Sequence, residues 1–356
     1  MKLQQAFDPR NNALNALRLV LAAEVILWHS FPETGHRPPE ALLQILFSIG
    51  VDGFFAISGF LITRSWLTHP RAGEYLAARA LRILPGLYVC LVVTAFVIAP
   101  ISVAVQGGSA MKLLMSTEPI EYVLKNSGVL YLQHHVGGTP TGIPDAAAGW
   151  NANLWSLIWE VACYLIVIIL GVVGLASRRW VSPVILVLAV CGAMLLPPLT
   201  FPGLWTIPQL LMRTAIMFAA GAVMYHWRDV IPARWSLVAV SVVIVLAAGL
   251  LPDYRVVAGL PLAYAVITSG ALLRHKRLNL RTDLSYGMYI YAFPTQQLLV
   301  VFGLAFLNPL VFFGVSTIAT LPLAALSWFL VEKRAMALKS RLKRRSVAPV
   351  PEPQPG

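Results

Sequence analysis

The chain has 356 residues, of which 58% are hydrophobic and only 12% are charged. Because soluble globular domains carry roughly a quarter charged residues, this composition excludes a soluble enzyme and predicts an integral-membrane protein. The net charge of +12 does not indicate nucleic-acid binding, since the basic residues fall on alternate loops between apolar stretches, as membrane orientation requires.

A membrane-spanning helix needs about 20 apolar residues. By that criterion the sequence predicts an all-α integral membrane protein, a bundle of about ten transmembrane helices. In chain order these cover residues 13–31, 43–66, 83–104, 153–175, 181–198, 209–227, 235–252, 256–273, 284–305 and 309–331. The first stretch contains Arg18, Glu24 and His29 and lacks a following small-residue cleavage site, so we interpret it as a retained helix and not as a signal peptide.

The basic residues predict the orientation of this bundle. Of the 27 Lys and Arg residues, 22 fall on the side of the N-terminus. Four fall on the opposite side and one within a span: Arg37, Lys112, Lys125 and Arg255, and Arg213 respectively. The positive-inside rule therefore predicts that both termini are cytoplasmic.

Residues 1–340 are expected to form one membrane domain, followed by a basic and then Pro-rich disordered tail at 341–356. The longest external segment, residues 105–152, is predicted to contain an interfacial helix within TEPIEYVLKNSGVLYL. Loops of this length are usually functional or disordered. The three cysteines lie in apolar runs without metal-ligand spacing, so no metal is expected.

Ionisable residues inside spans are costly and therefore mark candidate functional positions. Here they are Arg18, Glu24, His29, Asp52, Glu160 and Arg213. Arg18 and His29 are separated by eleven residues, about 16 Å along a helix and within about 20° of the same face. Glu24 points elsewhere and is left out of that row.

Asp52 and Glu160 each fall two or three turns below the outer end of a helix, at a depth comparable to His29. We therefore expect the three side chains to meet, with a carboxylate orienting an imidazole for acid–base chemistry. Structural explanations stay open: His29 as an interhelical hydrogen bond, Asp52 as a partner of Arg18 or Arg213, and Glu160 as a buried partner without a catalytic role.

A second cluster lies in YLAARALRILPGL, which places Arg79 and Arg82 on adjacent turns of one helix face at the cytoplasmic side. Two guanidinium groups suit an anionic phosphate ligand. Ordinary positive-inside anchoring explains the same pattern.

Six stretches in order carry a family resemblance. They are NNALNALRLVLAAEVILWHSFPETG, GVDGFFAISGFLITRSW, RALRILP, NLWSLIWEVACYL, SYGMYIYAFPTQQLL and SWFLVEKRAMALK. Together they resemble the acyltransferase family 3 membrane proteins, the O-acetyltransferases of bacterial surface polysaccharides, over nearly the whole chain. The chain departs from the family pattern at Asn15, Ala292 and Ala335, where Asp, His and Pro are common. The hydrolase-like domain that some relatives append after the last helix is not expected here.

The resemblance implies that Arg18 and His29 are the family's Arg/His pair and that Trp155, Glu160 and Tyr164 match its LW…E…Y motif. Together with Asp52, the Arg/His pair and Glu160 are the expected catalytic residues. Trp155, Tyr164 and Arg213 are the expected substrate contacts.

The resemblance also implies acyl-CoA, in the first instance acetyl-CoA, as donor. Its nucleotide is expected to stay at the cytoplasmic mouth against Arg79 and Arg82, while the pantetheine arm brings the thioester to His29. His29 then acts as general base on an acceptor hydroxyl or carries the acyl group. The expected location is the bacterial inner membrane, in contact with lipid. Expected acceptors are O-antigen, exopolysaccharide, peptidoglycan or a small glycoside.

Two other function classes stay open. A transporter or flippase of glycans or lipids would use the same charges as a proton relay, and a sensor or scaffold would only retain the fold. The Arg79/Arg82 motif and the lack of visible inverted repeats favour the enzyme.

Overall fold

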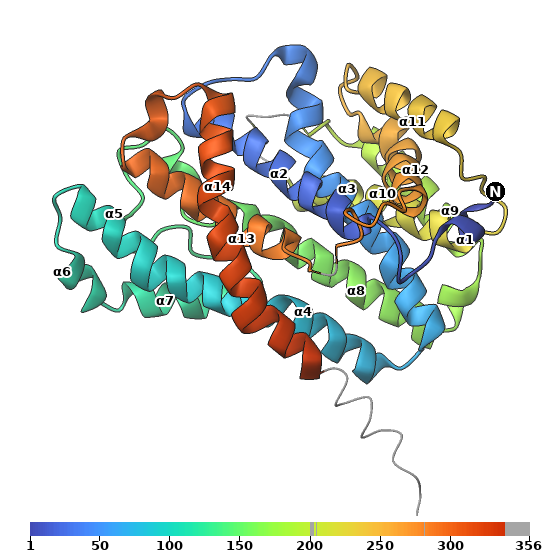
Figure 1. The fold of residues 1–356 in the computed structure, drawn as a ribbon, viewed down its shortest axis with the longest axis horizontal. Coiled ribbons are helices and arrows are strands. Elements are labelled where there is room, and N and C mark those ends of the chain that lie inside the picture. Colours follow the sequence, from blue (N-terminus) through green and yellow to red (C-terminus); the bar gives the residue numbers. More distant parts are fainter. Residues whose placement is uncertain (200–202, 204, 281, 339–356) are drawn as a thin grey trace, which may run out of the picture.

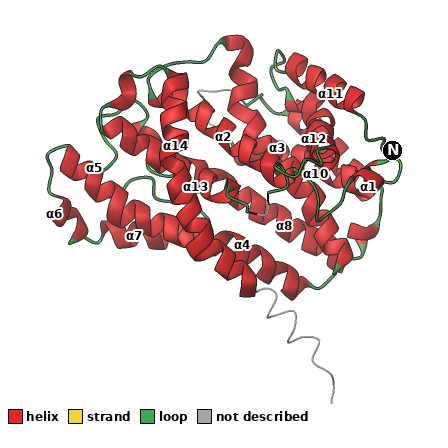
Figure 2. Ribbon diagram, viewed as in Figure 1, coloured by secondary structure: helices red, strands yellow, loops and turns green. Residues whose placement is uncertain are grey.

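The computed structural model describes residues 1–199, 203, 205–280 and 282–338 (Figure 1). Within these ranges the chain consists of helices and loops, with isolated β-bridges and no strand (Figure 2). The fold is a polytopic membrane helical bundle, which confirms the predicted fold class. The expected disordered tail at 341–356 and Arg281 lie outside the described residues.

A helix is present at each of the ten predicted spans. They are α2 (Leu14–Glu33), α3 (Glu40–Thr68), α4 (Ala72–Val93) continuing through the π-helix Thr94–Ile98 into α5 (Ala99–Val105), α8 (Leu157–Val172) after the 3₁₀ turn Ala152–Ser156, α9 (Val181–Leu195), α10 (Ile207–His226), α11 (Trp235–Ala248), α12 (Arg255–Leu272), α13 (Ser285–Val301), and α14 (Pro309–Ser327) continuing into the π-helix Trp328–Glu332. The short helices α1 (Leu3–Ala6), α6 (Ala110–Leu114) and α7 (Glu118–Asn126) complete the described elements.

By length and hydropathy alone, fewer than ten of the described helices qualify as candidate membrane spans. Seven of the described helical segments are long and apolar enough to cross a membrane, and α9 and α11 are shorter apolar helices, which gives seven to nine candidate spans. The remaining helix, α13, has 17 residues and buries most of its side chains against protein. Because its neighbours shield it from lipid, α13 accommodates polar residues that a lipid-facing span excludes.

In Figure 1, α2 and α13 lie near the centre, with α5–α7 towards one end and α9–α12 towards the other. The helix α3 crosses α10 in close backbone contact at two glycines. A Cβ on Gly59 would lie 2.0 Å from the carbonyl oxygen of Phe218, and a Cβ on Gly221 would lie 2.0 Å from that of Ala56. Small residues at such crossings let two helix backbones approach closely. The crossing therefore fixes which residues of α10 face the polar side chains of α3.

At each end of the bundle, the loops that contact one another are those that the predicted topology places on the same side. At one end the N-terminal segment bonds to two loops, with the Leu3 amide 2.8 Å from the Ile231 carbonyl oxygen and the Arg274 guanidinium 3.0 Å from the Ala6 carbonyl oxygen. At the other end, the Gln297 side chain donates to the Asp145 carbonyl oxygen over 3.1 Å. Segments predicted to share a side thus contact one another. The cytoplasmic assignment of the first end stays a prediction.

The external segment between α5 and α8 folds onto the bundle and then enters it. Its helix α7 lies within the stretch predicted to be helical. Further along, Trp150 and Asn151 are completely buried, and the Asn153 side-chain amide donates to the Tyr289 carbonyl oxygen of α13. Because the chain is already inside the bundle at this point, α8 begins below the outer surface.

Candidate active site

Three neighbouring cavities run in a row through the bundle. The inner cavity is lined by Arg79 and Arg82, and the outer cavity by His29. The middle cavity shares Arg18, Ser58, Glu160 and Tyr286 with the inner one, and Val51 and Tyr289 with the outer one. The row therefore links the end of the bundle predicted to be cytoplasmic with the opposite end.

Arg82 is neutralised within the inner cavity. Its Nη2 lies 2.5 Å from Asp283 Oδ2, and its Nη1 lies 3.7 Å from Glu332 Oε2. The same Asp283 oxygen is 2.7 Å from Arg18 Nη1. Burial alone would raise the pKa of Asp283, but the charges of Arg18 and Arg82 outweigh it and hold this pKa at about 2. Sequence reasoning missed Asp283 because it precedes α13 in a loop without a motif of its own.

Arg79 lacks a carboxylate partner among the described residues. Its Nη2 donates to Ser65 Oγ over 3.0 Å, and its guanidinium lies 5.5 Å from the Tyr75 ring centre and 5.8 Å from that of Tyr164. Its Nε is buried without a hydrogen-bond partner within the described chain. The two residues predicted to bind phosphate therefore differ, because no acid within the described residues compensates the charge of Arg79.

Glu160 lies in the middle and inner cavities beside Arg18, and not beside His29. Its Oε1 accepts hydrogen bonds from the Tyr164 hydroxyl and, over 3.4 Å, from Ser58 Oγ. The depth expected from the sequence was wrong because α8 starts inside the bundle, which moves Glu160 further from the outer surface.

His29 lines the outer cavity, which encloses about 1890 Å³ including the open solvent at its mouth. The edge of its ring meets Phe293, with ring centres 4.8 Å apart. Within the described chain, no hydrogen bond or ion pair reaches the imidazole. Its nitrogens are therefore available to a substrate. Most of the other large side chains around this cavity are aromatic: Trp28, Phe47, Tyr131, Trp155, Trp205 and Tyr289.

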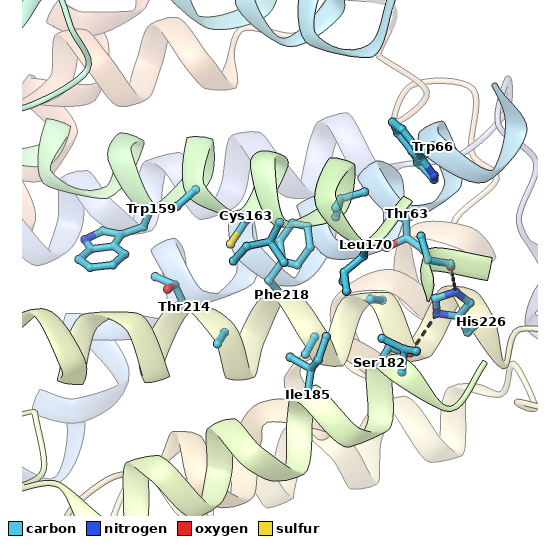
Figure 3. Close-up of a pocket in the computed structure, with 18 of the residues that line it drawn as sticks. Thr63, Trp66, Trp159, Cys163, Leu170, Ser182, Ile185, Thr214, Phe218 and His226 are labelled. Atoms are coloured by element: carbon cyan, nitrogen blue, oxygen red, sulfur yellow. Dashed lines mark hydrogen bonds between the residues drawn. The ribbon is translucent and has the colours of Figure 1, made fainter. Parts of the chain in front are cut away.

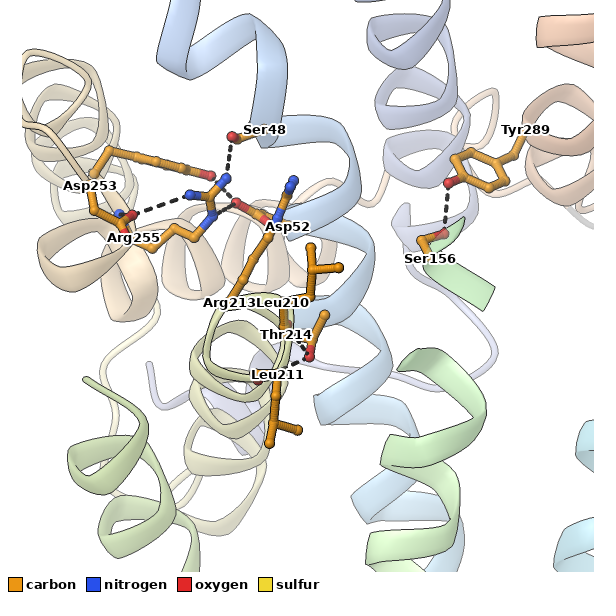
Figure 4. A network of polar contacts seen from close by, with 11 residues as sticks. Ser48, Asp52, Ser156, Leu210, Leu211, Arg213, Thr214, Asp253, Arg255 and Tyr289 are labelled. Carbon is orange, nitrogen blue, oxygen red and sulfur yellow. Dashed lines mark hydrogen bonds and ion pairs between the residues drawn. The ribbon is translucent and has the colours of Figure 1, made fainter. Parts of the chain in front are cut away.

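Asp52 is completely buried in an ionic cluster that joins α3, α10 and α12 (Figure 4). Its Oδ1 lies 3.0 Å from Arg213 Nε, and its Oδ2 lies 2.8 Å from Arg255 Nε and 2.5 Å from the Tyr254 hydroxyl. The Arg255 guanidinium also donates to Ser48 Oγ. Both oxygens of Asp52 are thus occupied by partners other than the imidazole.

The structure does not bring His29, Asp52 and Glu160 together as the sequence led us to expect. Of the alternatives left open, the pair of Asp52 with Arg213 is the one present. Arg255 was assigned to an external loop, but it begins α12 and is completely buried. A single sequence carries no signal for this pairing, because α3 and α12 are distant in the chain. The catalytic roles of the three residues stay predictions.

Two acids that were not among the expected catalytic or substrate-binding residues, Glu24 and Asp145, also line the outer cavity. Glu24 was set aside because it points away from the row of Arg18 and His29. Its carboxylate lies close against α3 at a glycine, since a Cβ on Gly50 would lie 2.2 Å from Glu24 Oε2. Asp145 lies in the external loop, where burial raises its pKa to about 6.

A separate cavity between α3, α8, α9 and α10 is almost entirely apolar (Figure 3). Its lining includes Trp66, Cys163 and Phe218. The histidine at its edge, His226, is held on both ring nitrogens, by Ser182 Oγ and by the Ala176 carbonyl oxygen, each at 2.9 Å. This cavity is therefore apolar, and its histidine is not free for acid–base chemistry.

Comparison with known proteins agrees with these features. The acyltransferase 3 family model, described as an acyltransferase domain, matches residues 11–329. An O-acetyl transferase of Shigella phage Sf6 is 27% identical over 362 residues, covering 93% of this chain and 98% of the relative. Nodulation protein 10 of Rhizobium leguminosarum bv. viciae is 27% identical over 375 residues, covering 95% of this chain and 97% of the relative. No solved structure matches. The chain therefore belongs to the acyltransferase 3 family and is an integral-membrane acyltransferase.

Proposed function

We propose that this protein transfers an acyl group, in the first instance acetyl, from cytoplasmic acyl-CoA to a hydroxyl of an extracytoplasmic glycan in the bacterial inner membrane. The observation that carries the proposal is the row of three neighbouring cavities between Arg79 and His29. The name of the phage relative, O-acetyl transferase, supports acetyl as the group.

The donor enters at the inner cavity. The nucleotide of acyl-CoA carries phosphates that cannot cross the hydrocarbon core, so it stays at the mouth, where the uncompensated guanidinium of Arg79 binds phosphate by charge-assisted hydrogen bonds. The uncharged pantetheine arm extends through the middle cavity, beside Glu160 and Tyr164, towards Tyr289.

His29 serves as general base from the outer cavity. An acceptor hydroxyl gives its proton to an imidazole nitrogen while its oxygen attacks the thioester carbonyl carbon. The carbon–sulfur bond then breaks, and the departing thiolate takes the proton from the imidazolium. The second route passes through an acyl-imidazole: the His29 nitrogen attacks the thioester carbon and the carbon–sulfur bond breaks, releasing the thiolate. The acceptor hydroxyl then attacks the acyl carbon, the carbon–nitrogen bond breaks to free the imidazole, and the hydroxyl proton goes to the thiolate. Both routes need a ring nitrogen free of protein partners, as the structure has it.

The test uses purified protein with labelled acetyl-CoA and cell-envelope glycan. Wild-type protein is expected to consume thioester, whereas His29→Ala is expected to lose at least about 100-fold in rate, the lower end of what a general base contributes. His275→Ala, in an exposed loop, is the matched control and should retain activity. Normal turnover by His29→Ala would refute the role of the imidazole. Glycan movement without thioester consumption would instead identify a transporter.

A further inference from the structure

The apolar cavity between α3, α8, α9 and α10 has no role in the proposed reaction. It encloses about 750 Å³ including the open space at its mouth, within the roughly 300–1,000 Å³ of small-molecule sites. Trp159, Cys163 and Phe218 point into it from the helices on either side (Figure 3). Three of the four helices, α3, α8 and α10, are long and apolar enough to cross a membrane. The cavity therefore lies at the depth of the hydrocarbon core.

The rim of this cavity is exposed on the outside of the bundle. Ile166 of α8 is 42% exposed and Leu211 of α10 is 38% exposed, although both line the cavity. The hydroxyl groups in the lining include those of Ser182 and Thr214, which already hold partners at 2.9 Å, His226 and a carbonyl oxygen of α10 respectively. Because apolar cavities do not hold water well, a hydrocarbon chain entering from the surrounding lipid is the ligand that suits this lining.

One end of the cavity lies at the level of lipid headgroups. The lining residues there are His226, which ends α10, and Ser182, in the first turn of α9. Directly beyond them in the chain lie two exposed tryptophans, Trp227 after α10 and Trp180 before α9. Exposed tryptophans at helix ends are typical of the interface between membrane and water. The predicted topology places this interface on the cytoplasmic side.

The loops at this end carry more arginines than acids. Arg228 Nη1 donates to a backbone carbonyl oxygen over 2.7 Å, and no carboxylate among the described residues pairs with Arg228 or with Arg178. Arg179 pairs with Asp229 at 2.9 Å, with both side chains exposed. Arg228 and Arg179 lie within electrostatic reach of the His226 ring at the cavity end. Three guanidinium groups against one carboxylate leave a net positive charge where a lipid headgroup would lie.

We propose that this cavity binds an acyl chain of an anionic phospholipid from the cytoplasmic leaflet, with the lipid phosphate held by Arg228 and Arg178. Guanidinium groups bind phosphate by charge-assisted hydrogen bonds, and basic pockets between helices on the cytoplasmic side bind acidic headgroups. A zwitterionic headgroup adds a cation that the arginines repel. The site is separate from the row of cavities, since Cys163 of α8 lines it whereas the next residue, Tyr164, lines the inner cavity.

The test is a thermal-shift titration of the purified, delipidated full chain in detergent. The probes are phosphatidylglycerol, phosphatidylcholine with the same chains, a long-chain isoprenyl phosphate and inorganic phosphate. Phosphatidylglycerol is expected to stabilise the wild type most. Arg228→Gln should weaken its binding at least about tenfold, the loss of one charged hydrogen bond. The matched control is Arg234→Gln, an exposed arginine at the same end that does not line the cavity and should leave binding unchanged.

A second pair of variants tests the acyl chain. Ala162→Phe places a ring in the cavity and should weaken phosphatidylglycerol binding, whereas Val187→Phe, at an exposed position of α9 outside the lining, should not. Without lipid, Arg228→Gln should unfold at the temperature of the wild type. The inference is overturned if any other probe stabilises the wild type as well as phosphatidylglycerol does, or if Arg228→Gln or a folded Ala162→Phe binds that lipid as the wild type does.

Discussion

The different surroundings of Arg79 and Arg82 lead to opposite expectations for two similar substitutions. Arg79 has no acidic partner in the described chain, so its charge is available to a phosphate. Arg82 already lies against Asp283 and Glu332. We therefore expect Arg79→Gln to weaken donor binding and Arg82→Gln mainly to weaken the fold.

The magnitudes follow from the contacts. One charge-assisted hydrogen bond contributes about 1.5–3 kcal/mol, so Arg79→Gln should raise the Kd for CoA by about 10- to 150-fold. Arg82→Gln leaves the nearly buried Glu332 without its cation. Removing one member of a buried ion pair costs about 3–5 kcal/mol of folding free energy. Because Arg18 still compensates Asp283, we expect a loss of stability at the lower end of this range.

Isothermal titration with CoA and thermal unfolding measure the two effects on the same samples. Arg71→Gln is the matched control, because Arg71 lies at the same end of α4 in an exposed pair with Glu74, 2.7 Å away. Equal losses of CoA affinity in the Arg79 and Arg82 variants, with unchanged unfolding temperatures, would refute the reasoning. If Arg79→Gln bound CoA with unchanged affinity, Arg79 would have no role in donor binding and would serve only as a positive-inside anchor.

The buried ions support two further predictions. Asp52→Asn should lower the free energy of unfolding by about 3–5 kcal/mol, because two buried arginines lose their shared carboxylate; wild-type stability in thermal unfolding would contradict this. The pKa of Asp283 is lowered to about 2 from an ordinary 3.8, so its contribution to stability is present above pH 3.8 and is lost as the pH falls from 3.8 to 2. Asp283→Asn should remove this pH-dependent stability, which amounts to about 2 kcal/mol. If acid unfolding of the variant still showed a loss of the same size, the pH dependence would belong to other groups.

Features that depend on one helix could be predicted from the sequence. Most helix boundaries followed from apolar length to within about four residues, but α4 begins at Ala72, eleven residues before the predicted span 83–104. The spacing of Arg79 and Arg82 placed both on one helix face, as expected. The same spacing rule placed Arg18 and His29 on one long helix, α2, where they line the inner and outer cavities respectively. Periodicity determines such positions because it is a property of a single helix.

Features that depend on how helices meet could not be predicted. Asp52 faces Arg213 and Arg255 because α3 crosses α10 at Gly59 and Gly221, and nothing local in the sequence identifies the residues that this crossing brings together. Glu160 lies deep because the non-helical segment before α8 is buried, whereas hydropathy assumes that a span starts at the surface. Glu24 packs closely against Gly50 of α3, and the sequence of α2 alone does not identify this neighbour.

The placement of Tyr289 connects these structural features to the proposed chemistry. Its ring lines both the middle and the outer cavity, and its hydroxyl lies 2.7 Å from Ser156 Oγ and 2.6 Å from the Asn153 carbonyl oxygen. These two partners belong to the buried segment that leads into α8, so hydrogen bonds from this segment hold the Tyr289 side chain in place between the two cavities. In the proposed reaction, the thioester reaches Tyr289 from the middle cavity and the glycan hydroxyl approaches from the side of His29, so the two reactants meet where this ring borders both cavities.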